Sequence, residues 1–237
     1  LAYANQLNEG MQQLELEKYN DERTITSEDL AKAVNNIYQK LDVENGGMLG
    51  SPKFMMPALL ELYNASPLLN HHLDLSLRKM ALGGLFDVLR GGFSRYSVDE
   101  RWHIPHFEKM GYDNGQLIYV YSEAYLRQAS PLYKEVVEKT VVFLQEELYN
   151  GSGGFYASLD ADSLDKNGQL EEGAFYVWTK NELEKLGLLQ QPHFCSYYGV
   201  NQDGIWEKEN YVFYRKYDLE DYKNTHGLND DFNLLVA

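Results

Sequence analysis

The chain has 237 residues, of which 44% are apolar, enough for a sizeable core, and its formal net charge is -15. A charge of this sign repels nucleic-acid phosphates and anionic membranes, so neither is expected as a partner. The one cysteine, Cys195, excludes an internal disulfide and a CxxC redox or zinc motif, and no apolar run approaches the ~20 residues of a membrane span. We expect a cytoplasmic protein.

The first 150 residues read as helices. Apolar residues recur at helical spacing over 1–19, 27–41, 57–64, 71–88, 109–128 and 131–149. Thr26 with Asp29 forms a near capping box, and Pro131 takes the usual first helical position. The segments 71–88 and 109–128 are apolar on most of their circumference, whereas 27–41 and 131–149 carry one stripe. This alternation predicts two concentric layers of helices joined as hairpins.

A Gly-Gly pair follows a helix three times, at 46–47, 91–92 and 153–154, and the last two pairs precede Phe93 and Phe155. A repeat of one helical hairpin per unit predicts a solenoid or a closed α/α toroid, whose loops would line a shared cavity. The alternative is three unrelated turns, because such pairs are common in loops.

Past residue 150 the pattern changes to period two. GGFYASLDADS and EGAFYVWT predict a β-hairpin joined by the acidic loop 162–172. Thr179 and Glu182 form a capping box for a short helix, 191–198 suggest another, and 210–215 suggest a strand. From Asp218 onwards the chain is polar, and we expect no final helix. Cys195 reads as a lone buried thiol or as a nucleophile served by His193.

The stretch GGFSRYSVDERWHIPHFEKMGYDNGQL, residues 91–117, gathers acids, bases, imidazoles and an indole. That inventory is typical of a functional site. Arg95 can bind a carboxylate or phosphate through two nitrogens, with Asp99 as its orienting partner; a purely structural Arg–Asp pair is the alternative. Tyr112, Asp113 and Asn114 open a helix, where the helix dipole favours a carboxylate; Asp113 is a site residue or a plain helix-start acid.

His103 and His106 are three residues apart, with Glu108 close by. Such a pair suits a metal or a base-and-acid couple. Zinc needs a third ligand in a defined place, and Pro105 disfavours the helix that would put both rings on one face. We therefore expect no metal here and expect His106 to line a cavity.

Asp160 and Asp162 stand in a turn beside the predicted hairpin, with Glu171 beyond them. Paired carboxylates do acid and base work in glycosidases. A calcium loop is a second interpretation, but Leu164 and Asp165 break the EF-hand register where it requires an oxygen ligand and glycine. An acidic turn is the structural alternative.

Several of these motifs resemble one family in order and spacing. They are SPKF at 51–54, the stretch 91–117, GGFYASLDADS at 153–163 and EGAFYVWT at 172–179. The family is the thioredoxin-domain-containing proteins of uncharacterised function, often labelled spermatogenesis-associated. It combines an N-terminal thioredoxin-like domain with an α/α toroid similar to N-acylglucosamine 2-epimerases and six-hairpin glycosidases.

The resemblance implies a mainly α fold. We expect one α/α-toroid domain over residues 1–237, with helical hairpins in two layers, a partial barrel and a small β-hairpin insertion after residue 150. The chain would be a fragment that lacks the thioredoxin-like domain and the later toroid hairpins, and that domain would be its partner in the full-length chain.

The toroid kinship points towards a sugar-like ligand. We expect no cofactor. In an epimerase or isomerase reading, His106 is the base, Arg95 and Trp102 hold the sugar, and Asp113 orients it. In a glycosidase reading, Asp113 and either Asp160 or Asp162 are acid and base. The alternative is a non-catalytic binding or scaffolding module. The candidate binding residues are Lys53, Asp87, Arg95, Tyr96, Trp102, Glu108, Tyr112, Asn114, Tyr176 and Trp178.

Overall fold

The computed structural model describes residues 2–15, 24–229 and 232. The chain divides into two compact units, Leu1–Lys40 and Leu41–Ala237. The first holds α1 (Ala2–Glu15) and α2 (Ser27–Tyr38). The predicted capping box is confirmed. The Thr26 side chain accepts from the backbone N–H of Asp29, and the Asp29 carboxylate accepts from the backbone N–H of Thr26. Residues 16–19, the end of the first predicted helix, lie outside the described residues.

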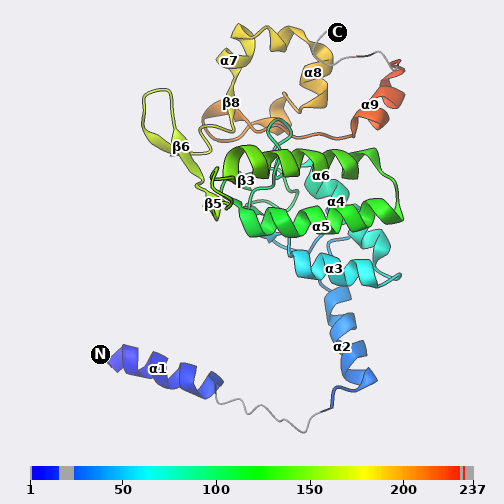
Figure 1. The fold of residues 1–237 in the computed structure, drawn as a ribbon, viewed down its shortest axis with the longest axis vertical. Helices are drawn as coiled ribbons and strands as arrows, with labels where there is room; N and C mark the ends of the chain where they lie inside the picture. The colour runs from blue at the N-terminus through cyan, green and yellow to red at the C-terminus, as the bar shows by residue number, and fades with distance from the viewer. Residues whose placement is uncertain (1, 16–23, 230–231, 233–237) are drawn as a thin grey trace. The chain divides into compact units, whose positions relative to one another are not determined.

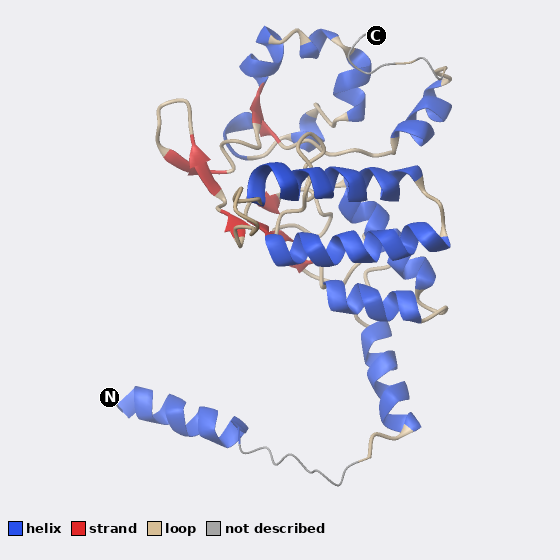
Figure 2. Ribbon diagram, in the orientation of Figure 1, coloured by secondary structure: helices blue, strands red, loops and turns tan. Residues whose placement is uncertain are grey.

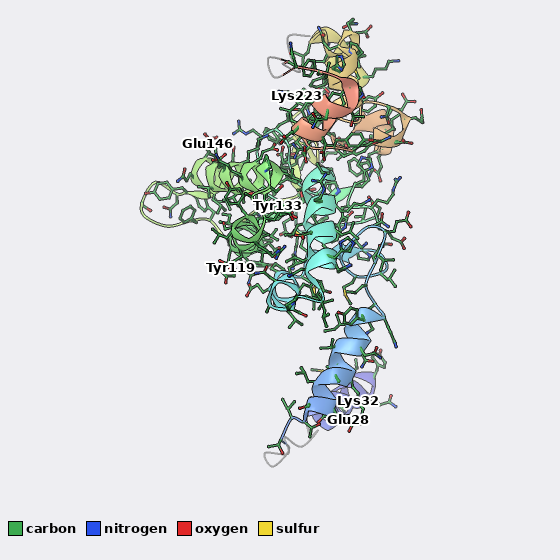
Figure 3. The ribbon with its side chains drawn as sticks, turned by 90° about the vertical axis from the view of Figure 1, so that its right-hand side faces the viewer. Glu28, Lys32, Tyr119, Tyr133, Glu146 and Lys223 are labelled. Carbon is green, nitrogen blue, oxygen red and sulfur yellow. The ribbon has the colours of Figure 1, made fainter. Side chains whose placement is uncertain are left out.

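The second unit is built on four helices, α3 (Pro57–Ala65), α4 (Asn70–Leu82), α5 (Gly111–Arg127) and α6 (Pro131–Phe143). A π-helical turn, Leu144–Leu148, extends α6. Helix α5 packs between α3 and α6, and α4 also contacts both of them (Figure 1). Figure 3 shows α3 and α5 nearly end-on beside α4. No helix of the described chain is long and apolar enough to cross a membrane.

Tyrosines tie α5 and α6 to α4. The Tyr121 hydroxyl on α5 donates to the carbonyl of Leu77 on α4 at 2.8 Å. The ring of Tyr121 meets that of Tyr133 on α6 edge-on at 5.6 Å, and the Tyr133 hydroxyl donates to Asp74 on α4 at 3.2 Å (Figure 3). Burial raises the pKa of both phenols, so both remain hydrogen-bond donors at neutral pH.

The mainly α fold class is confirmed. Helical hairpins carry the core, the β-structure is limited to small antiparallel pairs, and the described residues form no closed barrel. The expectation that 109–128 is buried on most sides is wrong. Helix α5 buries one stripe, whereas Tyr119 and Leu126 on its other faces are 55% and 79% exposed.

Helix α4 ends six residues before the predicted boundary at 88. A Cβ at Gly83 would lie 2.2 Å from the carbonyl oxygen of Trp102, so the chain leaves the helix where another backbone segment passes too close for any side chain. Residues 85–88 instead enter a turn, and the N–H of Leu85 donates to that same Trp102 carbonyl.

The strands are short (Figure 2). A three-stranded antiparallel sheet joins β1 (Lys53–Phe54), β2 (Tyr96–Ser97) and β3 (Pro105–His106). The other pairs are β4 (Lys109–Met110) with β5 (Ser158–Leu159), β6 (Asp162–Leu164) with β7 (Leu170–Glu172), and β8 (Trp178–Thr179) with β9 (Asn210–Tyr211).

The hairpin after residue 150 exists, but its predicted strands were wrong. It is β6–β7, inside the stretch expected to be its loop, because Asp165 accepts from the N–H groups of Asn167 and Gln169 and makes the tight turn there. The segments expected to pair with each other instead pair elsewhere, β5 with β4 and β8 with β9.

Three further helices follow in the described residues, α7 (Lys180–Lys185), α8 (Pro192–Tyr197) and α9 (Leu219–His226), with 3-10 turns at Leu188–Gln190, Gln202–Gly204 and Glu207–Glu209. The capping box of α7 is confirmed. The expectation of no helix after Asp218 is wrong, because the Asp218 carboxylate caps α9 by accepting from the N–H of Asp221.

The Gly-Gly pairs belong to a repeated turn. In the first, the backbone N–H of Asp42 donates to the carbonyl of Gly47, the carbonyl of Asp42 accepts from the N–H of Gly46, and the Asp42 carboxylate accepts from the N–H groups of Glu44 and Asn45. In the second, Asp87 bonds in the same way to Gly92 and Gly91, and its carboxylate accepts from the N–H groups of residues 89 and 90. A Cβ at Gly92 would lie 2.5 Å from the Phe143 ring, so only glycine lets this turn approach α6.

Each of these two turns holds a buried lysine. Lys53 bonds to Asp42 at 2.5 Å and to the carbonyl of Glu100 at 2.9 Å, and Lys109 bonds to Asp87 at 2.8 Å and to the carbonyl of Gly91 at 2.8 Å. Both lysine side chains are at most 2% exposed. The third turn has Asn150 in place of the aspartate and is exposed.

We predict that Asp87→Ala destabilises the fold by about 3–5 kcal/mol, because it leaves the Lys109 ammonium buried and uncompensated. Asn150→Ala, the equivalent change in the exposed turn, should cost under about 1.5 kcal/mol. Urea denaturation measures both. In the double variant Asp87→Ala/Lys109→Met the loss should shrink, because no charge is left buried. A double variant as unstable as Asp87→Ala would show that the ion pair is not what holds the turn.

Candidate functional site

Asp99 organises the loop between β2 and β3. Its carboxylate accepts from the backbone N–H groups of Arg101, His103 and Ile104 at 2.6, 3.3 and 2.6 Å. The predicted pairing of Asp99 with Arg95 is not what the structure has, because Arg95 binds Glu108 instead. Asp99 therefore fixes the loop backbone and leaves the neighbouring side chains to form the site.

Arg95, Glu108 and Asp113 form one electrostatic cluster. The Arg95 guanidinium binds the Glu108 carboxylate at 3.1 Å, and the backbone N–H of Arg95 donates to the backbone carbonyl of Glu108 at 2.8 Å. Asp113, in the first turn of α5, is 8% exposed. Burial raises the pKa of Asp113 to about 6, with Glu108 adding repulsion and Arg95 opposing it. A carboxyl with this pKa can both give and take a proton near neutral pH.

His106 is held from two sides. Its Nδ1 lies 2.8 Å from Oε1 of Glu172, and its ring stacks on Tyr96 at 4.9 Å between centroids, with 16° between the planes. Tyr96 in turn contacts the ring of Phe54, 4.8 Å away. Strand pairing sets this up, because Tyr96 and His106 are direct partners across β2 and β3.

The contact with Glu172 determines what His106 can do. A carboxylate accepts the Nδ1 proton, which places the free lone pair of a neutral ring on Nε2. No described residue hydrogen-bonds Nε2, and the side chain is 30% exposed. A carboxylate that fixes the tautomer and orientation of an imidazole is the arrangement of a general base.

Glu172 also lines a cleft. It ends β7, opposite Asp162 of β6, and the cleft, of about 680 Å³, lies between the hairpin and α7; His106 is not among its lining residues. Sequence reasoning placed Glu172 in the acidic stretch but assigned it no role. No local signal could have found it, because its partner is 66 residues away.

Four predicted binding residues instead hold the fold. Lys53 and Asp87 belong to the two buried ion pairs. Trp102 is fully buried, and its indole N–H donates to the carbonyl of Asn45 at 2.9 Å. Asn114 is also fully buried and bonds to the backbone N–H and carbonyl of Phe93 at 2.7 and 3.0 Å. Lys53, Trp102 and Asn114 are at most 2% exposed, and Asp87, whose side chain is 14% exposed, is bound to Lys109, so these side chains stay out of the site that we propose.

The remaining aromatic candidates differ in exposure. Tyr176 stacks on Phe107 with 5.7 Å between centroids and belongs to the apolar cluster around Phe107. Trp178 stacks on Phe213 with 5.8 Å between centroids. Tyr112 is 53% exposed at the start of α5, next to Asp113, and is therefore available to a ligand.

The predicted carboxylates after residue 150 are exposed. Asp160 accepts from the backbone N–H of Asp162 at 3.1 Å, as in an acidic turn. Asp162 projects from β6 across from Glu172. Among the described residues, no group of three or more His, Cys, Asp or Glu side chains is placed to hold a metal ion.

Of the two interpretations of Cys195, the nucleophile served by His193 is not what the structure has. The thiol donates to the carbonyl of Leu188 at 3.4 Å, and burial raises its pKa. His193 instead lies 3.1 Å from the Tyr222 hydroxyl. A protonated thiol without an adjacent base is not a nucleophile.

No family model matches the chain. The chain is 40% identical to spermatogenesis-associated protein 20 of Homo sapiens over 173 residues, which are 66% of this chain and 22% of that protein. It is 40% identical to the protein of the same name from Mus musculus over 157 residues, or 61% and 20% of the two chains. An uncharacterized protein of Caenorhabditis elegans is 42% identical over 118 residues, or 48% and 16%. The chain thus spans about a fifth of the length of the curated relatives that it matches.

These matches agree with the spermatogenesis-associated resemblance carried by the motifs; the thioredoxin-like domain stays an expectation. Among solved structures, a sugar epimerase from a ruminal bacterium aligns with a TM-score of 0.46 at 18% identity, over 54% of this chain and 37% of that one. Cellobiose 2-epimerase from Bacillus thermoamylovorans B4167 aligns with a TM-score of 0.45 at 12% identity, over 74% and 54%. Both alignments have a TM-score under 0.5 and an identity under 25%.

We predict that Asp113→Asn stabilises the protein at pH 7.5 and has little effect at pH 4. The unfolded carboxyl ionises near 3.8 and the folded one at about 6, so unfolding releases a proton between these values, and stability falls as the pH rises through that window. Above this pH window, the ionised Asp113 lowers the free energy of unfolding by at most about 3 kcal/mol, a loss that the neutral amide of Asn avoids. Thermal denaturation across pH 4–8 measures the difference; a constant gap between parent and variant would contradict the raised pKa.

Proposed function

We propose that this chain contributes the site of an enzyme that moves a proton on a sugar, as in epimerisation or isomerisation. The observation that carries the proposal is the His106–Glu172 contact at 2.8 Å, which leaves Nε2 of a half-buried imidazole without a partner among the described residues. Proton transfer by a positioned histidine accelerates a reaction typically 10²- to 10⁴-fold.

The proton transfer would occur next to a carbonyl of the open-chain sugar. Nε2 of His106 takes the proton from the carbon beside the carbonyl, and the electron pair of that C–H bond moves into an enediolate. A proton returned to the same carbon from the opposite face gives the epimer, and one returned to the former carbonyl carbon gives the isomer. Glu172 stabilises the imidazolium formed in the first step.

Asp113 and Arg95 supply the second half of the chemistry. Because its pKa is about 6, Asp113 is present in both protonation states near neutral pH and can return or relay a proton. Arg95 is 43% exposed even while bound to Glu108, so its guanidinium can also hold developing negative charge on the enediolate oxygens.

A sugar suits the surroundings of these groups. Phe54 and Tyr112 are 43% and 53% exposed, and the Tyr96 ring stacks on the His106 imidazole. Aromatic rings with polar tips next to carboxylates and a guanidinium offer an apolar face and hydrogen-bonding groups together. The motif resemblance to proteins with an epimerase-like toroid supports the same class of ligand.

A glycosidase is the second candidate, and the observation that favours it is the raised pKa of Asp113, as expected of a general acid. Its base would be Asp160 or Asp162. A non-catalytic binding module is the third. The three differ in products, because proton transfer exchanges a carbon-bound hydrogen with solvent, hydrolysis releases a reducing sugar, and a binding module does neither.

We predict that the protein, incubated with reducing sugars in D₂O, incorporates deuterium beside the carbonyl, as followed by NMR. His106→Gln should lower this exchange at least about 100-fold, and Glu172→Gln should lower it less, because the imidazole remains but loses its orientation. His71→Gln is the matched control, since that histidine is exposed on α4.

Exchange that survives in His106→Gln would overturn the assignment of the base. Reducing-sugar release from glycosides that is lost in Asp113→Asn, without deuterium incorporation, would select the glycosidase. Inactivity in both assays would favour the binding module.

A further inference from the structure

A second cleft, of about 400 Å³, lies between α4, the loop after β2 and the segment that follows β9. Its lining includes five basic side chains and one acidic one, namely Arg78, Lys79, Arg101, Arg215, Lys216 and Asp203. The whole chain has 21 basic and 36 acidic residues, so this gathering of positive charge opposes the composition of the protein.

Three of these cations have no carboxylate partner among the residues that the structure describes. Arg78 binds Asp218 and Asp221, and Arg215 binds Glu135. Within the described chain, Lys79, Arg101 and Lys216 form no ion pair, and all three are exposed. Positive charges held together without counter-charges repel one another, and a bound anion relieves that repulsion.

Arg215 adds a buried donor. The residue is 4% exposed; its Nη1 binds both oxygens of Glu135 at 3.0 and 2.9 Å, and its Nη2 donates to the carbonyl of Ala81 at 3.2 Å. Its Nε is buried and has no hydrogen-bond partner in the described chain. Leaving a buried donor unsatisfied is costly, and the donor belongs to a charged group that lines the cleft.

His103 contributes a neutral wall. Its ring packs against Tyr214 at 4.7 Å, and its Nε2 lies 3.2 Å from the carbonyl of Val212, which fixes that nitrogen as the donor. His103 and Tyr214 both line the cleft. An anion here would therefore meet both cations and an aromatic surface, which suits a ligand with an anionic group attached to a small organic body.

We propose that this cleft binds a small oxyanion, either inorganic phosphate or the phosphate of a phosphomonoester, through Arg101, Lys216, Lys79 and the Arg215 guanidinium. Arginine and lysine are the usual phosphate-binding side chains. The cleft uses none of the residues of the His106–Glu172 site, so the proposal stands without the proposed function.

Isothermal titration calorimetry of the intact protein with sodium phosphate tests this proposal. Titration with sodium chloride at the same ionic strength is the reference. We expect saturable binding that weakens as salt is added. Arg101→Gln and Lys216→Gln should each raise Kd about tenfold or more, since hydrogen bonds to charged groups contribute at that scale. Both positions are exposed, so the variants should fold.

Lys180→Gln is the matched control, because this lysine is exposed and has no ion pair in the described chain. Glucose 6-phosphate binding more tightly than phosphate would identify a phosphomonoester as the ligand, and equal affinity would identify phosphate alone. Absence of saturable binding, or equal losses in Lys180→Gln and the cleft variants, would overturn the proposal.

Discussion

The buried pairing of an aspartate with a lysine inside a Gly-Gly turn supports the rest of the second unit. Asp87 accepts backbone hydrogen bonds in the turn after α4 and also forms an ion pair with Lys109. Lys109 lies in β4, immediately after the segment that carries His106 and Glu108, so one ion pair anchors the loop at its beginning and near its end. Asp42 and Lys53 do the same for the preceding turn and β1. Removing either partner would leave a charge in the interior, which ties the position of the candidate site to the integrity of these pairs.

The candidate site is assembled from parts with little regular structure of their own. His106 comes from a two-residue strand, Asp113 from the start of α5, and Glu172 from a hairpin. Loops placed by a rigid helical frame commonly carry function, because they can change without disturbing the core. Here the frame is α3–α6, and the Asp99 carboxylate fixes the connecting loop by accepting three backbone N–H groups.

Local signals predicted most of the helices. The capping boxes at Thr26 and Thr179 have their partners three residues away, so sequence alone identified them. The end of α4 depends on the Trp102 carbonyl, and the role of Glu172 depends on His106, which no local pattern reveals. The same limit explains why Trp102 and Asn114 were predicted to bind a ligand but instead hydrogen-bond to backbone groups. The type of a residue does not tell whether its side chain faces a ligand or the protein backbone.

The two buried lysines also change how the protein meets amine-reactive reagents. An amine that is hydrogen-bonded and at most 2% exposed cannot be acylated without an opening of its turn. Modification of Lys53 and Lys109 would therefore report how often these turns open in the native protein, whereas exposed lysines such as Lys180 react at the rate of free amines. The fold thus contains internal probes of its own local unfolding, and one of them, Lys109, lies at the end of the loop that carries the candidate base.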